Sequence, residues 1–475
     1  MVRKEQQHKQ IKVKNAPGRI PFLGHTLQLY FDPVNFINQC KKERGPAFRV
    51  SLVGQEFYVM TGTLIHDMCY SPKEFDHYDG IQFMAPIDRI LRICYQHKNK
   101  FKSSQLGIFS KRIQQGLSKA LEAQLHLEPG EKRELSIRND KTLRNILLQL
   151  TSLCFIGSEV GDNPKLISAT DEFCRKTIQA GLILNSFPEW VAVPIIRRFV
   201  TVEKNLDCIM GLLVPQLENV RSRQKVSGCH DEKEEISLAS LVLNMTKHNG
   251  ELYTPKEAAL YFARISLSGG IAPGFATTFM LFEIARRPSL VNDLRKEIEK
   301  LEENERTPEK ISQIKLLDSI LREVFRCKIS SLGMFHKTRT DVTLATGEIV
   351  PSGCMSLGAL LDAHTDPTIM KQTAIIGSPL PVPLAQFDPY RFVNVQENCS
   401  TKKSTSLGSE YITFGLSHHA CPGRYLGTLI IKYVVAELFM KFNITVKLGK
   451  EQQDSDIFGL IRLPPPGAFI FEART

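Results

Sequence analysis

One cysteine near the C-terminus stands between glycines, in the segment F-G-L-S-H-H-A-C-P-G-R of residues 414–424. An apolar stretch that we expect to be helical follows at once. Glycines let the backbone approach a flat group that a side chain would strike, while loop N–H groups and the positive end of a helix lower the pKa of a nearby thiol. Cys421 is therefore suited to ligate a heme iron as a thiolate, which favours O–O cleavage. The alternative is one buried cysteine among the eleven of the chain.

The same loop resembles the heme-binding loop of the cytochrome P-450 family of heme-thiolate monooxygenases, whose pattern is F-x-x-G-x-R/H-x-C-x-G. Ser417 replaces the first glycine of the pattern, and the matching residues are Phe414, His419, Cys421 and Gly423. The resemblance implies heme b (iron protoporphyrin IX) as the cofactor, Cys421 as the axial iron ligand, and the other three matching residues at the heme. The resemblance covers nearly the whole chain. The sequence A-C-P-G-R at residues 420–424 is similar to that of filamentous-fungal members of the family.

Two further motifs resemble parts of the family that support this loop. L-R-E-V-F-R at residues 321–326 is similar to the E-x-x-R helix, in which Glu323 and Arg326 lie one turn apart. F-D-P-Y-R-F at residues 387–392 is similar to F-x-P-x-R-F and supplies Arg391. The resemblance implies that these three charged residues form a buried structural triad near the loop. The alternative is an ordinary surface ion pair, because E-x-x-R occurs by chance in many helices.

The resemblance also implies cations at the heme propionates. His419 stands where the family has Arg or His, and His336 stands where a strand arginine usually reaches the second propionate. The usual W-x-x-x-R is absent from residues 97–125, so Lys102 is our choice there. Imidazolium pairs with a carboxylate, although its charge depends on pH as that of guanidinium does not. The alternatives are structural histidines and a solvated basic face that meets a redox partner.

The longest apolar stretch predicts a central helix over residues 256–287, ending before Pro288. Aligned on that end without gaps, it places the oxygen-activation motif of the family, A/G-G-x-D/E-T, on S-G-G-I-A at residues 268–272. Ile271 and Ala272 replace the acid and the alcohol. Neither side chain can act as the general acid that helps deliver protons to dioxygen.

We nevertheless assign the distal oxygen-activation segment to Ser268, Gly269 and Ala272. Pro273 should bend the helix here, because proline removes one helical hydrogen bond. Three explanations account for the missing acid and alcohol. Ser268 or a chain of ordered water delivers the protons, a hydroxyl of the substrate delivers them, or the enzyme does not activate dioxygen. We favour the first two together.

Composition favours one large domain, since 42% of the 475 residues are hydrophobic and no Gly/Ser-rich linker divides them. The resemblance implies a mainly α fold with small β-sheets, a single cytochrome P-450-like domain. We divide it into a basic N-terminal segment with a proline-rich hinge, residues 1–24, and a heme-thiolate catalytic domain, residues 25–475. Eleven scattered cysteines without a C-x-x-C pair indicate neither a disulfide framework nor a zinc ribbon, and favour a reducing, cytosol-facing location.

The hinge reads A-P-G-R-I-P-F-L-G at residues 16–24, and no run approaching the ~18 apolar residues that span a bilayer precedes it. We expect the membrane anchor of such relatives to be absent from this chain. The protein is then expected to lie on the cytosolic face of the endoplasmic reticulum membrane either through an anchor that is missing from this chain, because the chain starts late or the anchor was removed, or by peripheral docking of its basic residues. A solvated tail is the alternative for these basic residues. Residues 187–200, which contain the only tryptophan, resemble the substrate-entry lid of the family.

Together the motifs imply a heme-thiolate monooxygenase that hydroxylates or desaturates a bulky lipophilic substrate with dioxygen. Electrons would come from NADPH-cytochrome reductase, a flavoprotein. The net charge of +11 is dispersed and is not interleaved with aromatic residues, which favours a basic face for an acidic electron donor over a nucleic-acid site. The fungal resemblance implies a terpenoid or another secondary metabolite as the substrate.

Two alternative functions stay open. A heme-thiolate isomerase, dehydratase or peroxide-using enzyme is favoured by the missing acid and alcohol, and such an enzyme would turn over without a reductase. A non-catalytic heme-binding homologue is favoured by the missing W-x-x-x-R and by Ser417.

Overall fold

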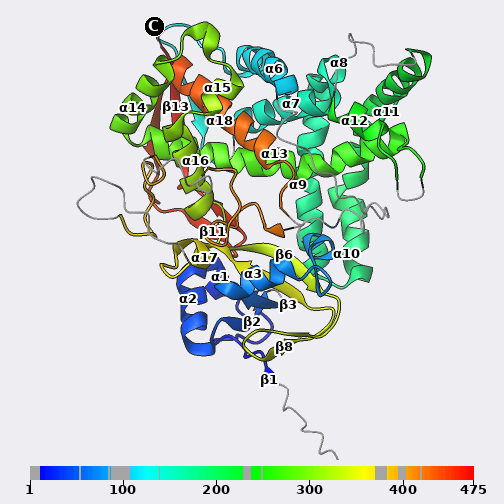
Figure 1. Cartoon of the computed structure of the whole chain (residues 1–475), viewed down its shortest axis with the longest axis vertical. Helices are drawn as coiled ribbons and strands as arrows, with labels where there is room; N and C mark the ends of the chain where they lie inside the picture. Colours follow the sequence, from blue (N-terminus) through cyan, green and yellow to red (C-terminus); the bar gives the residue numbers. More distant parts are fainter. Residues whose placement is uncertain are drawn as a thin grey trace, which may run out of the picture.

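The structure is a computed structural model, and it describes residues 11–52, 55–83, 86, 107–138, 140–227, 237–247, 250–369, 382–393, 403–417 and 420–474. Figure 1 shows a large helical part at the top and a smaller part rich in strands below it. The prediction of a mainly α fold with small β-sheets is confirmed.

Helices dominate the described chain, and two of them, α13 and α18, are apolar on nearly every side. Such a pattern is typical of helices in the core of a large protein. The helices are α1 (Thr26–Phe31), α2 (Pro33–Arg44), α3 (Thr63–Tyr70), α4 (His77–Ile81), α6 (Gly107–Leu125), α7 (Thr142–Ile156), α8 (Ser158–Gly161), α9 (Pro164–Ser186), α10 (Glu189–Ile195), the π-helix η2 (Ile196–Val200), α11 (Val202–Ser227), α12 (Leu238–Leu243), α13 (Pro255–Ala285), α14 (Pro288–Glu299), the 3₁₀-helix η3 (Glu303–Glu305), α15 (Pro308–Ser312), α16 (Lys315–Cys327), α17 (Leu360–Thr365) and α18 (Arg424–Lys441).

The strands form four small sheets in the orders β2-β3-β9-β6-β4, β10-β13-β5, β1-β8-β7 and β11-β12. Their bounds are β1 (Ile11–Lys12), β2 (Ala47–Leu52), β3 (Gln55–Met60), β4 (Phe75–Asp76), β5 (Lys132–Ser136), β6 (Leu332–Thr338), β7 (Val342–Thr343), β8 (Glu348–Val350), β9 (Met355–Ala359), β10 (Phe442–Leu448), β11 (Ser455–Ile457), β12 (Ile461–Leu463) and β13 (Gly467–Ala473). In the largest sheet β2 and β3 are antiparallel, with Ala47 opposite Met60.

The central helix predicted for residues 256–287 is α13. Thr254 caps its N-terminus in a capping box with Glu257, and Pro255 occupies the first turn, where no backbone N–H is needed. The helix ends at Ala285, because Pro288 begins α14. In the described ranges α13 is the one helix long and apolar enough to cross a membrane, yet half of its most apolar window is buried. It packs against α7, α11 and α18, as a core helix does.

Residues 11–24 lie along the strand-rich part, where Ile11 pairs with Glu348 and Asn15 with Arg49. This pairing ties the segment before the hinge to two sheets by backbone contacts. The division of the chain at residue 24 stays a prediction.

Candidate functional site

The cysteine loop, residues 411–423, comes directly before α18 in the chain. The N–H of Cys421 donates to the carbonyl of Phe414 over 2.7 Å, and the N–H of Gly415 donates to that of Ile412 over 2.9 Å. Gly415 has φ 73° and Ser417 has φ 55°. Both angles lie in the left-handed region that glycine enters freely and serine does not. Ser417 therefore keeps the backbone conformation that the family pattern assigns to glycine.

Two opposing influences act on the pKa of the Cys421 thiol. Burial raises the pKa of the Cys421 thiol, while the backbone N–H groups of Gly423 and Arg424, and the charge of Arg424, act to lower it. Burial disfavours a thiolate that has no cationic partner, whereas a coordinated metal ion deprotonates a thiol outright. The donors and the burial together fit a thiolate ligated to a heme iron.

Three glycines on or next to α13 and α18, two helices that contact each other, have open space where a side chain would stand. A Cβ added to Gly274 of α13, or to Gly423 or Gly427 at the start of α18, would meet no atom within 4 Å. Gly270 differs, because a Cβ there would collide with Leu148 of α7. Gly270 thus serves helix packing, whereas the other three glycine positions are open, as close approach of a flat macrocycle would require.

The open face of α13 carries the predicted distal segment. Ser268 and Ala272 are exposed although they lie one turn apart in the middle of a core helix, and Gly269 beside them is half-buried. Ile271 packs against the apolar cluster formed mainly by α9, α11 and α13. The residue that replaces the family acid therefore points to the core, and the hydroxyl of Ser268 is on the open face.

Pro273 lies inside α13, and the helix continues across it. A proline has no N–H for the carbonyl four residues earlier, which is that of Gly269. The hydroxyl of Thr151 on α7 lies 3.3 Å from this carbonyl and 2.8 Å from the carbonyl of Leu147, so the two carbonyls share its single hydrogen. Thr151 thus offers a substitute donor at the predicted distal segment.

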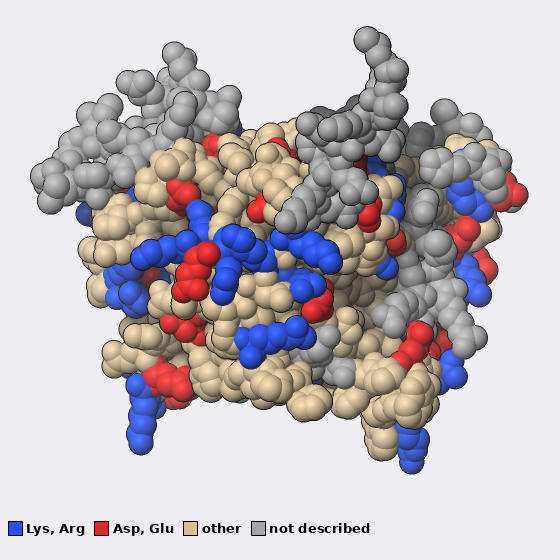
Figure 2. Space-filling view, turned by 90° about the horizontal axis from the view of Figure 1, so that it is seen from below, with Lys and Arg blue, Asp and Glu red and all other residues tan. Residues whose placement is uncertain are grey.

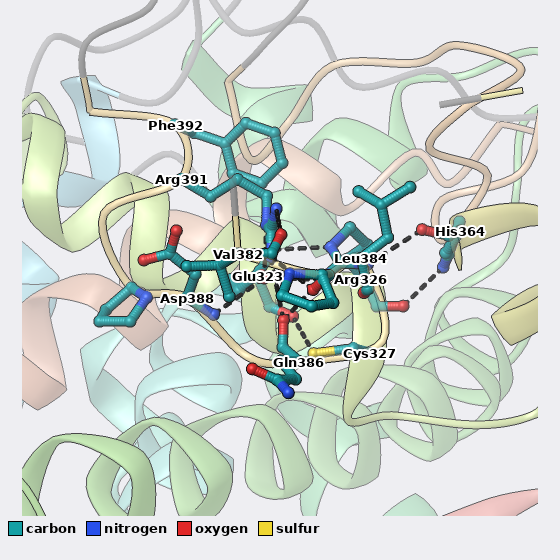
Figure 3. A network of polar contacts seen from close by, with 12 residues as sticks. Glu323, Arg326, Cys327, His364, Val382, Leu384, Gln386, Asp388, Arg391 and Phe392 are labelled. Carbon is teal, nitrogen blue, oxygen red and sulfur yellow. Dashed lines mark hydrogen bonds and ion pairs between the residues drawn. The ribbon is translucent and has the colours of Figure 1, made fainter. Parts of the chain in front are cut away.

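The three residues of the predicted triad meet in a buried network (Figure 3). Arg326 holds Glu323 through two contacts of 2.6 Å, from Nε to Oε2 and from Nη2 to Oε1. Arg391 Nε donates to Glu323 Oε1 over 2.9 Å, and the N–H of Asp388 donates to the same oxygen over 3.0 Å. The side chains of Glu323 and Arg326 are fully buried. The remaining guanidinium donors reach carbonyls of residues 382–386 and of His364.

The predicted heme contacts are distributed as follows. Phe414 packs edge-on against Phe325 of α16, with 5.0 Å between ring centroids. His336 is fully buried on β6, and its Nδ1 lies 2.7 Å from the carbonyl oxygen of Met334. Its ring lies 4.9 Å from that of His77, centroid to centroid. His419 and Lys102 lie outside the described residues, so their proposed propionate contacts stay predictions.

Sequence reasoning missed three residues of this arrangement. Thr151 and His364 belong to the surroundings of the site through contacts distant in sequence, and nothing in their local spacing indicates it. Arg424 had a signal, because a cation follows the cysteine within one helical turn. It donates from Nη1 to the carbonyl of Cys421 over 3.0 Å and from Nη2 to the hydroxyl of Tyr425 over 3.1 Å.

In a comparison with known proteins, residues 97–471 match the sequence model of the cytochrome P-450 family. Similar curated proteins include the cytochrome P-450 monooxygenase 71 of Postia placenta, 27% identical over 69% of this chain and 63% of the relative. The monooxygenase CYP512U6 of Ganoderma lucidum is 27% identical over 69% of this chain and 63% of its own length. The monooxygenase ntnM of Nectria is 26% identical over 72% of this chain and 65% of its own length.

The chain thus spans about 63% of the length of the first relatives that it matches. The family match covers most of the chain, including α13, the triad and the cysteine loop. The chain belongs to the cytochrome P-450 family, whose cofactor is heme b.

Proposed function

We propose that this chain is a heme-thiolate monooxygenase that hydroxylates or desaturates a bulky lipophilic substrate. The observation that carries the proposal is the Cys421 thiol, which accepts hydrogen bonds from two N–H groups beside glycines that leave room for a flat cofactor. Heme, when bound, would activate dioxygen for the oxidation of the substrate. In hydroxylation one oxygen atom enters a C–H bond and the other leaves as water, while NADPH provides two electrons through its cytochrome reductase.

Ser268 is the proposed proton donor of the distal segment. Its hydroxyl lies on the open face of α13, one turn before Ala272, which is exposed but carries no polar group. A positioned hydroxyl relays protons as a general acid when water or a substrate hydroxyl completes the path. Gly269 keeps the backbone close to α7, where a Cβ would approach Thr151 to 3.2 Å.

The triad of Glu323, Arg326 and Arg391 is proposed to be structural. Its charges are all buried, and each guanidinium also holds backbone carbonyls. Such a network fixes α16 against the segment before the cysteine loop, so it acts on the iron ligand only through position.

Association with the endoplasmic reticulum membrane is part of the proposal. Trp190 on α10 and Phe199 on η2 are 79% and 75% exposed, and Phe22 and Phe31 near the N-terminus are 99% and 76% exposed. Figure 2 shows the end of the molecule that carries β1, where Lys and Arg are spread among fewer acidic groups. A basic surface gains about 1 kcal/mol per Lys or Arg near an anionic leaflet. These features support peripheral docking on the cytosolic face.

A terpenoid or another secondary metabolite is the proposed substrate class, supported by the fungal origin of the relatives. The alternative of an isomerase, dehydratase or peroxide-using enzyme is favoured by Ala272, which stands on the open face in place of an alcohol. These two proposals differ in the need for NADPH and reductase.

The test is the difference spectrum of the reduced, carbon-monoxide-bound protein beside a Cys421→Ser variant, followed by turnover with and without NADPH and reductase. We expect a red-shifted Soret band that the variant lacks, and product only with the reductase. Absence of the band from heme-loaded protein contradicts thiolate ligation. Product formed without NADPH supports the isomerase, dehydratase or peroxide-using alternative.

A further inference from the structure

One buried imidazole connects the triad to the cysteine loop. His364 on α17 is 1% exposed. Its Nδ1 lies 2.8 Å from the carbonyl oxygen of Arg326, and its Nε2 accepts from the N–H of Ile412 over 3.0 Å. Figure 3 shows its ring beside the triad. The ring therefore touches α16 with one nitrogen and the start of the loop with the other.

These contacts specify one tautomer. Since Nε2 accepts a hydrogen bond, it carries no proton, and Nδ1 must then bear the hydrogen that is donated to the Arg326 carbonyl. The surroundings keep this ring neutral, because burial and the nearby guanidinium groups of Arg326 and Arg322 lower the pKa of His364 to about 3. A single neutral tautomer makes the imidazole a rigid spacer of fixed length.

A series of hydrogen bonds connects the imidazole of His364 to Cys421. The guanidinium of Arg326 donates from Nη1 to the carbonyl of His364 over 3.0 Å, so the two residues bind each other in both directions. Ile412 in turn accepts from the N–H of Gly415 over 2.9 Å. Beyond that turn, the carbonyl of Phe414 accepts from the N–H of Cys421 over 2.7 Å.

We infer that His364 is a positioning residue that fixes the cysteine loop relative to the triad and so orients the Cys421 sulfur. The inference that the Cys421 sulfur is oriented for the iron rests on the proposed heme-thiolate function. The hydrogen bonds from Arg326 through His364 to Ile412 do not depend on heme. A positioning role of His364 predicts that the acceptor at Nε2, which holds the loop, matters more to the sulfur than the donor at Nδ1.

The chain contains a matched control. His25 is also 1% exposed and bridges in the same manner, with Nδ1 accepting from the N–H of Ser51 over 3.0 Å and Nε2 lying 3.2 Å from the carbonyl of Ala16. It belongs to the strand-rich part, in the cluster of β2 and β3. Substitution of His25 therefore removes an equivalent bridge without touching the loop.

The experiment compares His364→Leu, His364→Gln and His364→Asn with His25→Leu. Glutamine places a side-chain oxygen near the position of Nε2, whereas asparagine reproduces only the Nδ1 position. Two quantities are measured at a temperature where all variants remain folded by circular dichroism. They are the ratio of thiolate to thiol bands in the carbon-monoxide spectrum, and the hydrogen exchange rate of the peptide that contains Ile412.

We expect His364→Leu and His364→Asn to lower the band ratio and speed the exchange by about tenfold, the effect of one buried hydrogen bond. His364→Gln should recover most of both, and His25→Leu should change neither. If all three His364 variants match His25→Leu, or if asparagine restores the loop as well as glutamine, the inference is wrong. If the wild-type protein lacks the thiolate band but the variants show the expected differences in hydrogen exchange, the proposed function is wrong and the positioning of the loop by His364 is supported. Should His364→Leu not fold, the Gln and Asn pair decides.

Discussion

The hydroxyl of Thr151 on α7 lies 3.3 Å from the carbonyl oxygen of Gly269 on α13, the carbonyl that Pro273 leaves without its helical donor. This contact joins a packing helix to the distal segment. It explains how a proline is tolerated in the central helix, since an unpaired buried carbonyl is costly.

Thr151→Val tests this contact. We expect the free energy of unfolding to fall by about 1 kcal/mol, because valine preserves the shape but removes the donor. Thr278→Val is the control, since its hydroxyl donates to the carbonyl of Gly274 within the same helix, over 2.9 Å. Denaturant titration of both variants measures the difference. Equal losses would assign no special role to Thr151.

Ser268→Ala tests the proton donor. We expect kcat to fall on the order of 10²-fold, within the range for general acid catalysis, while the carbon-monoxide spectrum stays unchanged. NADPH consumed per product formed should rise, because oxygen is then reduced without oxidising substrate. Ala272→Thr is the complementary variant, since its position is exposed on the same face. Unaltered coupling in Ser268→Ala would shift the proton source to the substrate.

Arg326→Met tests the triad. The change strands the buried carboxylate of Glu323 beside Arg391 alone, so we expect a loss of about 3–5 kcal/mol in the free energy of unfolding. Lys132→Ala is the control, because its pair with Glu472 is exposed, with side-chain exposures of 61% and 38%, and should be worth under about 1 kcal/mol. Similar losses in both variants would show that the network contributes no more than a surface pair.

His364 also makes stability depend on pH. The pKa of its imidazole falls from 6.5 to about 3 on folding, so between these values the unfolded chain binds a proton that the folded chain does not. The free energy of unfolding therefore decreases as pH falls through this window, by at most about 1.4 kcal/mol per pH unit. His364→Gln should flatten the profile relative to His126→Gln, whose imidazole is exposed. Parallel profiles would exclude this contribution.

Ser417→Gly tests backbone strain in the cysteine loop. Relief of the left-handed conformation at φ 55° is worth roughly 1–2 kcal/mol, and the greater freedom of glycine in the unfolded chain offsets part of it. We expect a small net gain in thermal stability and slower loss of heme. Gly415→Ala, at φ 73°, should have the opposite effect. A faster heme loss in Ser417→Gly would show that the serine side chain stabilises the loop.

The sequence predicted those features that depend on neighbouring residues. The hairpin of β7 and β8 is local in the same sense, because the two short strands pair across a turn at Gly347, which has φ 90°. The bounds of α13 follow from prolines at either end. These are local signals, so a single chain is enough to read them.

Contacts between distant segments could not be predicted in this manner. The acceptor of the Ile412 N–H is a ring 48 residues earlier, and Thr151 meets Gly269 across 118 residues. The role of His336 at a propionate stays a prediction, and nothing in the sequence indicates the register shift between Gly333 and His336 in β6. Such features arise from packing, for which no local residue pattern exists.

The order of the elements along the chain has a consequence for biosynthesis. Cys421 and the helices α16, α17 and α18 follow α13 in the sequence. At roughly 5–20 residues per second, the ribosome completes the distal helix well before it makes the iron ligand. Maturation with heme is therefore a late step, and a chain that terminates before Cys421 lacks the residue that ligates the iron.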